Sequence, residues 1–161
     1  MIRTGIGFDA HRLVAGRPLV LGGVRIEHER GLQGHSDADV VCHALVDALF
    51  GAVAAGSIGE HFPDTDPRWK DADSVAFVRA AVTHIATLGA RVVNVDVTVI
   101  AEAPKLAPHV EAMRERLAPA LGLGVDAVSV KGTTVEGMGA FGRGEGIAAM
   151  AVATVRAEDR G

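Results

Sequence analysis

The alternation of hydrophobic and polar residues along the chain predicts a series of short strands. The segments with this pattern are residues 2–8, 18–26, 92–100, 125–131 and 147–155, the second divided into two strands around Gly22-Gly23. In the third segment, β-branched residues alternate with Asn94, Asp96 and Thr98. These three polar side chains are therefore expected on one face of a strand.

Hydrophobic residues at helical spacing predict three helices, over residues 38–54, 74–88 and 104–121. Gly89 is a natural stop for the second helix, and Pro104 suits the first turn of the third. A loop rich in Pro and Asp (56–69) and a Gly-rich turn (137–146) lie between the predicted elements. Strands that alternate with helices predict an α/β (α+β) two-layer sandwich, with a mixed sheet covered by helices on one face. We expect a single catalytic domain over residues 1–161.

The start of the first helix has a distinct polar pattern. Ser36 and Asp39 have the spacing of a capping box, which predicts that the helix begins there. At 100° per residue, one polar stripe of this helix contains Ser36, Asp39, His43 and Asp47, and the opposite, core-facing side contains Val41, Leu45, Ala48 and Leu49. A histidine in that stripe would stand near the sheet edge, where the strand ending at Asp9 and His11 can meet it.

Composition narrows the class of protein. The chain has 161 residues, 48% of them hydrophobic, and a net charge of −4, which is typical of a globular domain without the basic surface that holds nucleic acid. Aromatic residues make up 4% and Tyr is absent, which disfavours base stacking. The single cysteine excludes an internal disulfide and suits a reducing compartment. With no signal-like or membrane-spanning segment in the sequence, we expect a cytoplasmic protein without a membrane partner.

Asp9, His11 and His43 are candidate metal ligands. They supply three nitrogen and oxygen donors, one fewer than the four of a closed tetrahedral zinc site, so an open position would remain for water or substrate. The same set also suits Mn²⁺ or Co²⁺. The alternative is that Ser36 only caps the helix and that His43 is a surface or hydrogen-bonded histidine.

Two features predict that the open position holds a phosphate. The helix start at His35 and Ser36 offers unpaired N–H groups and a partial positive charge to an anion. A second cluster, residues 131–136 followed by the Gly-rich turn, contains two threonine hydroxyls, Glu136 and Arg143. Glu136 suits Mg²⁺ bridging phosphates, and Arg143 suits bidentate anion contacts. The alternative is a flexible hairpin whose glycines only supply positive φ angles.

Several motifs together carry a resemblance to one family. They are Gly7-Phe8-Asp9-Ala10-His11, His35-Ser36-Asp37-Ala38-Asp39 with His43-Ala44-Leu45 and Asp47-Ala48-Leu49, Phe62-Pro63-Asp64-Thr65-Asp66-Pro67, Asn94-Val95-Asp96, Ala103-Pro104-Lys105 and Gly142-Arg143-Gly144-Glu145-Gly146. In this order and spacing, the chain resembles the 2-C-methyl-D-erythritol 2,4-cyclodiphosphate synthases of the non-mevalonate isoprenoid pathway over roughly residues 1–155.

The resemblance implies a homotrimer around a central threefold axis, with active sites between neighbouring subunits. It also implies a phosphorus–oxygen lyase acting on a small cytidine diphosphate substrate. The 2-phosphate of 4-diphosphocytidyl-2-C-methyl-D-erythritol 2-phosphate attacks the β-phosphorus of the same molecule, which releases CMP and closes the cyclic diphosphate. Such a reaction requires positioning and charge neutralisation rather than a protein nucleophile.

The resemblance also implies roles for individual residues. Asp9, His11 and His43 match the zinc ligands, Glu136 matches the ligand of Mg²⁺ or Mn²⁺ on the diphosphate, and His35 and Thr134 match the residues that stabilise the transition state. The pocket for the methylerythritol phosphate is matched by Asp9, His11, His35, Ser36, Ser57, Ile58, Gly59, Phe62, Asp64 and Asp66. The cytidine and diphosphate contacts are matched by Ala101, Ala103, Pro104, Lys105, Leu106, Ala107, Thr133, Thr134 and Glu136. Arg143 and Glu145 match a pair near the central cavity, where some relatives bind an isoprenoid diphosphate.

Three positions need separate treatment. Ser57 stands where relatives often carry Asp, but a serine can still exchange a hydrogen bond, so activity is expected to be retained. Ala140-Phe141 departs from the family pattern, so the resemblance does not extend to the lining of the central cavity. Cys42 lies next to His43, but one helical step turns it about 100° away, which predicts a packed thiol rather than a fourth ligand.

Two other functions compete with the synthase. A metal-dependent phosphodiester hydrolase would use a zinc-activated water, but the sequence offers no convincing base for it. A non-catalytic trimeric nucleotide-binding or sensor protein would keep its metal for structure, but a structural zinc favours four protein ligands.

Overall fold

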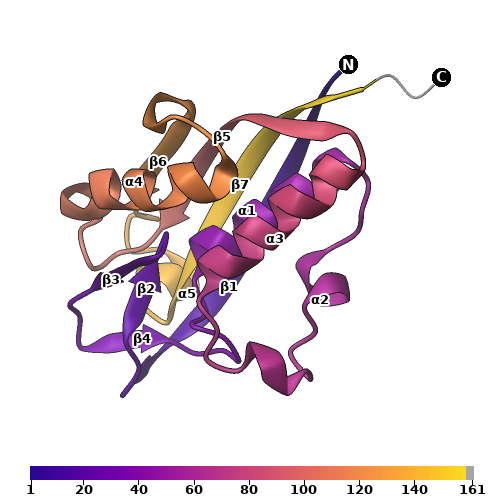
Figure 1. The fold of residues 1–161 in the computed structure, drawn as a ribbon. Helices are drawn as coiled ribbons and strands as arrows, with labels where there is room; N and C mark the ends of the chain where they lie inside the picture. The colour runs from indigo at the N-terminus through magenta and orange to yellow at the C-terminus, as the bar shows by residue number, and fades with distance from the viewer. Residues whose placement is uncertain (159–161) are drawn as a thin grey trace.

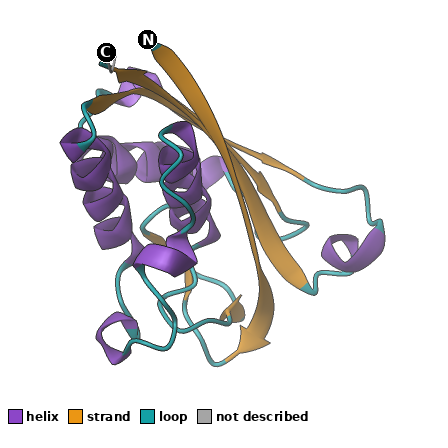
Figure 2. Ribbon diagram, turned by 90° about the vertical axis from the view of Figure 1, so that its right-hand side faces the viewer, coloured by secondary structure: helices purple, strands orange, loops and turns teal. Residues whose placement is uncertain are grey.

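The computed structural model describes residues 1–158 and consists of a long twisted sheet with helices packed against one face. Figure 2 shows this arrangement edge-on, with most helices on one side of the long strands and one short helix on the other. The mixed α/β architecture expected from the sequence is therefore confirmed. In the described part of the chain, no helix is both long enough and apolar enough to cross a membrane.

Within residues 1–158, the main sheet has five strands in the order β4-β1-β7-β5-β6. The strands are β1 (Ile2–Ala15), β4 (Arg30–Leu32), β5 (Ala90–Ile100), β6 (Val128–Thr133) and β7 (Gly146–Ala157). Neighbours pair antiparallel except β5 and β6, which are parallel. A separate hairpin is formed by β2 (Leu19–Leu21) and β3 (Val24–Ile26), joined by Gly22 and Gly23 at φ of 59° and 72°. Two residues with positive φ are typical of a tight hairpin turn.

The helices are α1 (Val40–Ala52), α2 (Ile58–His61), α3 (Ser74–Thr87), α4 (Val110–Leu121) and α5 (Gly139–Gly142). Helix α1 packs directly on β1 and β7, α3 packs on α1, and α4 lies against α3 and β6. Because α1 lies between the sheet and α3, both of its sides are buried, including Val41, Leu45 and Leu49. The residues predicted to face the core are thus buried, but so is His43 from the predicted polar stripe, so the helix does not have one polar side.

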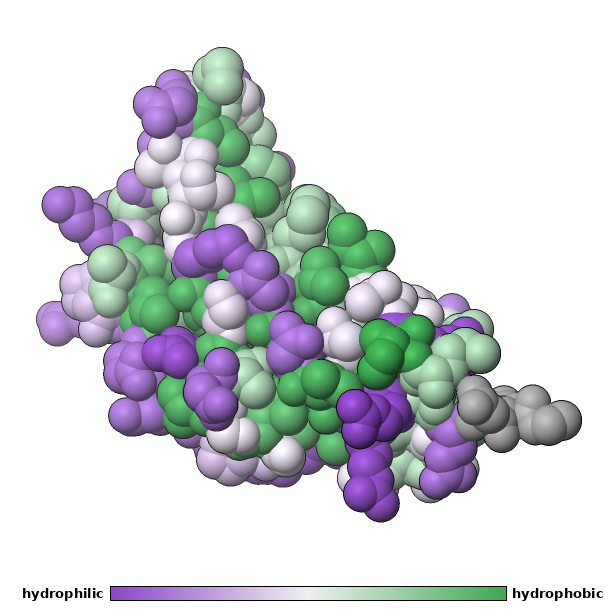
Figure 3. Space-filling model, turned by 90° about the horizontal axis from the view of Figure 1, so that it is seen from above, coloured by the Kyte–Doolittle hydropathy of each residue, from purple (hydrophilic) through white to green (hydrophobic). Residues whose placement is uncertain are grey.

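The opposite face of the sheet is open and apolar. Ile6 and Phe8 of β1 and Met150 and Val152 of β7 are directly paired across the two strands, and all four side chains are exposed. Figure 3 views the molecule from above and shows hydrophobic surface on the side of the sheet that faces away from the helices. A continuous exposed apolar patch often marks an interaction surface in soluble proteins.

Several predicted boundaries were wrong. Strand β1 continues to Ala15, so Asp9 and His11 lie inside it and not at its end. The short strand β4 was not predicted, and the expected loop over residues 56–69 contains α2 and the 3₁₀ turn Pro67–Trp69. The Gly-rich turn contains α5 and is not a hairpin loop, since β5 lies between β6 and β7.

The third predicted helix begins later than expected. Helix α4 starts at Val110 and is preceded by a 3₁₀ turn, Ala107–His109, in which Pro108 occupies an early position. Pro104 lies outside the helix. The prediction that Pro104 lies in the first turn of this helix was therefore wrong, and Pro108 is the proline next to the helix start.

The capping box at Ser36 was also wrong. The N-cap of α1 is Asp39, whose carboxylate accepts from the backbone N–H groups of Val41 and Cys42. The same buried carboxylate accepts from Gly22 and Gly23, at 2.9 and 2.7 Å, and so ties the hairpin turn to the start of the helix. Burial, with the nearby Asp37 charge, raises the pKa of Asp39. The hydroxyl of Ser36 instead accepts from the N–H of Ala38.

Candidate metal and substrate site

The three predicted metal ligands converge in the structure. Asp9 and His11 are two residues apart on β1 and therefore point to the same face of the sheet, the one covered by helices. His43 lies in the first turns of α1, which packs on that face. One donor atom from each residue lies within 4.8 Å of the others.

The orientation of the side chains suits a shared cation. Asp9 Oδ2 lies 3.1 Å from His11 Nε2 and 3.0 Å from His43 Nδ1, so both rings direct a nitrogen toward one carboxylate. His11 Nδ1 lies 2.7 Å from the carbonyl oxygen of Gln33. Because a carbonyl can only accept, Nδ1 carries the proton, and the lone pair of neutral His11 is on Nε2. Two imidazole nitrogens and one carboxylate oxygen, partly open to solvent, fit a divalent metal with a free coordination position.

The pKa values of the triad reflect this close contact. Burial alone would raise the pKa of Asp9, but hydrogen bonds from His11 and His43, together with their charges, hold it well below its usual range. The hydrogen bond to Asp9 raises the pKa of His11 in spite of partial burial. The close contact thus favours the charged forms of both Asp9 and His11.

Cys42 does not contribute to this group. Its side chain is fully buried and its Sγ donates to Asp39 Oδ2 at 3.3 Å. Burial and the Asp39 charge raise the pKa of the thiol well above its ordinary value. The expectation of a packed thiol is confirmed.

A cavity of about 400 Å³ opens beside the triad. Of the residues predicted for the methylerythritol phosphate pocket, the structure places Asp9, His11, His35, Ser36, Ile58, Gly59, Phe62 and Asp64 in its lining. His35 Nε2 donates to the backbone carbonyl of Asp66 at 2.9 Å, which fixes the ring at the cavity wall.

Two predicted pocket residues do not line this cavity. The hydroxyl and the N–H of Ser57 both donate to the Glu60 carboxylate, at 3.1 and 3.2 Å. The carboxylate of Asp66 is bound by Arg68, with its closest contact at 2.6 Å. The side chains of Ser57 and Asp66 are thus engaged by neighbours within their own loop.

Trp69 and Phe77 also line the cavity and were not predicted. With Phe62 they form an aromatic wall, in which Phe62 stacks on Phe77 at 4.7 Å and Trp69 meets both rings edge-on. A chain with 4% aromatic residues concentrates three of them at one cavity. Because aromatic residues are so rare in this sequence, the positions of Trp69 and Phe77 close to predicted site residues could have marked them as candidates.

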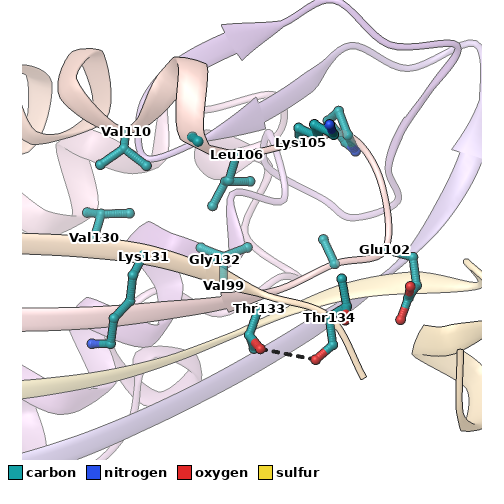
Figure 4. A pocket seen from close by; sticks show the side chains of 13 residues that line it. Val99, Glu102, Lys105, Leu106, Val110, Val130, Lys131, Gly132, Thr133 and Thr134 are labelled. Atoms are coloured by element: carbon teal, nitrogen blue, oxygen red, sulfur yellow. Dashed lines mark hydrogen bonds between the residues drawn. The ribbon is translucent and has the colours of Figure 1, made fainter. Parts of the chain in front are cut away.

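A second cavity, of about 590 Å³, lies between β6 and the start of α4. The predicted cytidine and diphosphate residues that line it are Ala101, Pro104, Lys105, Leu106, Ala107, Thr133 and Thr134, whereas Ala103 is not in the lining. Figure 4 shows apolar side chains, Leu106, Val110 and Val130, at one end and Thr133, Thr134 and Glu102 at the other. An apolar floor with a few convergent polar groups is typical of a small-molecule site.

The loop that carries Glu136 is held by a residue that sequence reasoning missed. Glu136 adopts a left-handed conformation with φ of 54°, and its N–H donates to the Thr134 hydroxyl. Glu102 Oε1 accepts from the N–H groups on either side, those of Val135 and Gly137, at 3.0 and 3.2 Å. Glu102 therefore fixes the loop, and the exposed side chain of Glu136 takes no part in these bonds.

Glu136 and Arg143 line neither cavity. Arg143 Nε donates to Glu145 Oε2 at 2.8 Å, so the predicted pair is formed within the chain. One carboxylate can hold Mg²⁺ only when other ligands, such as substrate phosphates, complete the coordination. Glu136 fits that description.

Within one chain, the two halves of the predicted site lie apart. Asp9 and His11 lie on β1, whereas Thr133 ends β6 and Thr134 follows it. Strands β7 and β5 separate β1 from β6 in the sheet. Three strand spacings amount to about 14 Å. The linings of the two cavities share no residue.

Comparison with known proteins gives consistent matches. The family model described as the YgbB family matches residues 2–156. A 2-C-methyl-D-erythritol 2,4-cyclodiphosphate synthase from Salinibacter ruber is 57% identical over 155 residues, which cover 96% of this chain and 99% of the relative.

Solved structures agree with this match. A structure of 2C-methyl-D-erythritol-2,4-cyclodiphosphate synthase in a CDP-bound form has a TM-score of 0.88 at 38% identity, covering 96% of this chain and 100% of the other. The bifunctional IspDF from Campylobacter jejuni has a TM-score of 0.94 at 40% identity; the match covers 99% of this chain but 43% of that longer protein.

Proposed function

This chain belongs to the YgbB family, whose matched relatives are 2-C-methyl-D-erythritol 2,4-cyclodiphosphate synthases, and on that premise we propose how its residues carry out the synthase reaction. The function is cyclodiphosphate synthesis in the non-mevalonate route to isoprenoids. The enzyme converts 4-diphosphocytidyl-2-C-methyl-D-erythritol 2-phosphate to 2-C-methyl-D-erythritol 2,4-cyclodiphosphate and releases CMP. We place it among the phosphorus–oxygen lyases, since a P–O bond to CMP breaks as the ring P–O bond forms.

The observation that carries the mechanism is the convergence of Asp9, His11 and His43 beside a cavity. A divalent metal held by these residues, Zn²⁺ or else Mn²⁺ or Co²⁺, would supply positive charge to orient and polarise a diphosphate oxygen. The triad leaves a position for that oxygen because the protein provides three ligands where a tetrahedral ion takes four.

The residues around this cavity position the attacking half of the substrate. The aromatic wall of Phe62, Trp69 and Phe77 excludes water from the methylerythritol carbons. Ser36, Asp64 and the backbone of Ile58 and Gly59 supply polar contacts to its hydroxyls and 2-phosphate. The ring of His35 lines the cavity and is oriented by its bond to the Asp66 carbonyl. In its imidazolium form, Nδ1–H would donate to charge that develops on the phosphates.

The second cavity receives the leaving group. Its apolar floor accepts the cytosine and ribose, while Lys105 and the backbone of residues 101–107 contact the cytidine. The hydroxyls of Thr133 and Thr134 donate to the phosphates. Glu136 would bind Mg²⁺ or Mn²⁺ together with the α- and β-phosphates, which neutralises charge on the departing CMP.

Assembly into a homotrimer would bring the two cavities together. The separation of about 14 Å across four strands supports an active site in which one subunit provides the triad and its neighbour provides the cytidine cavity. The exposed apolar face formed by Ile6, Phe8, Met150 and Val152 supports subunit packing through the sheet around a threefold axis.

Two further proposals concern the whole chain. Residues 1–161 act as a single catalytic domain in the cytoplasm, with no nucleic acid or membrane partner; the buried, unpaired Cys42 agrees with a reducing compartment. The Arg143–Glu145 pair lies at the mouth of the central cavity of the trimer, where an isoprenoid diphosphate would meet the arginine.

One assay tests the proposed function. The protein is incubated with the diphosphocytidyl substrate, Zn²⁺ and Mg²⁺, and the products are followed by phosphorus NMR. Free CMP with a cyclic diphosphate is the expected result. CMP with a linear product would indicate hydrolysis by a metal-bound water, and binding without turnover would indicate a nucleotide-binding protein.

A further inference from the structure

His43 is contacted on its buried side by two serine hydroxyls. Its Nε2 lies 2.9 Å from Ser74 Oγ and 3.2 Å from Ser36 Oγ, on the opposite edge of the ring from Asp9. Ser74 is the first residue of α3 and is fully buried. His43 and Ser36 are also buried, although both line the cavity.

The direction of the hydrogen bonds follows from Asp37. Ser74 Oγ lies 2.5 Å from Asp37 Oδ1, and the N–H of Ser74 donates to Asp37 Oδ2 at 3.0 Å. An ionised carboxylate only accepts, so the single hydroxyl proton of Ser74 is committed to Asp37. The oxygen of Ser74 can then only accept from His43, which places a proton on His43 Nε2.

We propose that Ser74 and Asp37 are positioning residues of the metal-binding triad, fixing His43 with its proton on Nε2 and its Nδ1 lone pair directed toward Asp9 and His11. This inference rests on the proposed function, because it requires the triad to bind a divalent metal. The order Asp37–Ser74–His43 parallels the contact of His11 with the Gln33 carbonyl, which fixes the other histidine in the opposite tautomer. Each imidazole thereby presents one unprotonated nitrogen at the same place.

Ser36 has a different role in this arrangement. Its hydroxyl oxygen already accepts from the N–H of Ala38 and lies 3.4 Å from Ser74 Oγ. It has no contact with a carboxylate among the described residues that would commit its proton. Ser36 therefore remains free to turn its proton toward the cavity, which it lines.

The first measurement uses the zinc-loaded protein labelled with ¹⁵N. In the unmodified protein, NMR should detect a slowly exchanging Nε2–H on His43. Ser74→Ala should speed this exchange, because it removes the nearer acceptor and leaves only Ser36 Oγ at 3.2 Å. Ser74→Thr, which retains the hydroxyl, should restore slow exchange.

The second measurement is zinc affinity by competition with a chelator. Ser74→Ala and Asp37→Asn should weaken zinc binding roughly 10–100-fold, as expected for loss of a partner that orients a metal-bound histidine. The control is Asp73→Ala, which removes the N-cap of the same helix and its ion pair with Arg116 without touching His43. It should leave the affinity unchanged.

The outcomes separate this inference from the proposed function. Failure of the unmodified protein to bind zinc would overturn the metal site and the inference together. Normal zinc binding, with unchanged affinity and equally slow Nε2–H exchange in Ser74→Ala, would overturn the inference alone. Equal weakening by Ser74→Ala and Asp73→Ala would show a general effect of the helix start and would also overturn it.

Discussion

A Cβ atom built on Gly7 would lie 1.9 Å from the carbonyl oxygen of Ala44. The backbone of β1 thus touches the backbone of α1 one residue after His43 and two residues before Asp9. Gly5 makes the same kind of contact one turn along, with the Ala48 carbonyl oxygen at 2.1 Å from its built Cβ. The close approach that lets His43 reach Asp9 requires glycine at both positions.

Gly7→Ala should therefore force α1 away from β1. We expect a loss of stability of about 1–3 kcal/mol or more, the usual cost of overpacking, and a marked loss of zinc affinity as His43 moves from Asp9. Denaturant unfolding and chelator competition measure the two effects.

Gly51→Ala is the matched control on the same helix. The nearest atoms to its built Cβ are in β1, at 3.7 and 3.8 Å, which is ordinary contact. Replacing a helical glycine there should be neutral or stabilising by about 0.5–1 kcal/mol, with zinc affinity retained. Equal effects of the two substitutions would contradict the role given to Gly7.

The sequence predicted the Asp9–His11 half of the triad because its geometry is local, whereas His43, 34 positions from Asp9, was joined to it by the chemistry of the donors. Two residues on one strand share a face whatever the rest of the fold does, so Asp9 and His11 were paired correctly even though the end of the strand was misplaced. The start of α1 was predicted wrongly, because Ser36 and Asp39 are both residue types that favour the N-cap position. The hairpin turn at Gly22-Gly23 favours Asp39 as the N-cap, because its two N–H groups also donate to the Asp39 carboxylate.

The division of the site into two cavities could not be predicted from residue patterns. Thr134 and Glu136 follow strand β6, and Asp9 lies on strand β1. The alternation of hydrophobic and polar residues predicts the two strands but does not reveal that β7 and β5 lie between them in the sheet. Strand order depends on which distant segments pair. The support from Ser74 and Glu102 was missed for the same reason, since each contacts a residue more than 30 positions away.

His43→Ala should abolish zinc binding and turnover while the trimer still assembles. The substitution leaves Asp9 and His11 as two ligands, too few to hold the ion, but does not touch the apolar outer face of the sheet. Metal analysis, the phosphorus NMR assay and sedimentation measure the three properties. His109→Ala, at a histidine outside the triad, is the control, and equal zinc content in His43→Ala and the unmodified protein would refute the ligand assignment.

Glu136→Gln should retain zinc but lose most turnover, because it removes a carboxylate proposed for the second metal and keeps its shape. Glu136→Gly tests the backbone separately, since φ of 54° is comfortable for glycine. Both variants should lose activity to a similar extent. Near-normal activity at saturating Mg²⁺ would refute the role of the carboxylate.

Glu102→Ala should loosen the loop around Glu136. It removes the acceptor of two N–H groups, each bond being worth about 0.5–1.5 kcal/mol. Hydrogen exchange at Val135 and Gly137 should accelerate, and the Mg²⁺ concentration needed for turnover should rise. Glu102→Gln keeps a side-chain oxygen as acceptor and should retain most protection; faster exchange in both variants alike would mean that charge, not the acceptor, holds the loop.

Metal binding and the stability of the metal-free protein should respond to pH in opposite directions. The pKa of His11 is raised above its ordinary 6.5 by Asp9, so the protonated pair stabilises the metal-free fold fully below that pH and ceases to do so as pH rises through the raised value. The pKa of Asp9 is depressed, so its own contribution to stability is retained down to acid pH.

Between pH 6 and 9, the Tm of chelator-treated protein should therefore fall relative to that of His11→Asn. Over the same range, the zinc affinity of the unmodified protein should rise as His11 loses its proton. Scanning fluorimetry and calorimetric titration at each pH provide the test. Parallel Tm curves for the two proteins would show that the Asp9–His11 contact does not control this response.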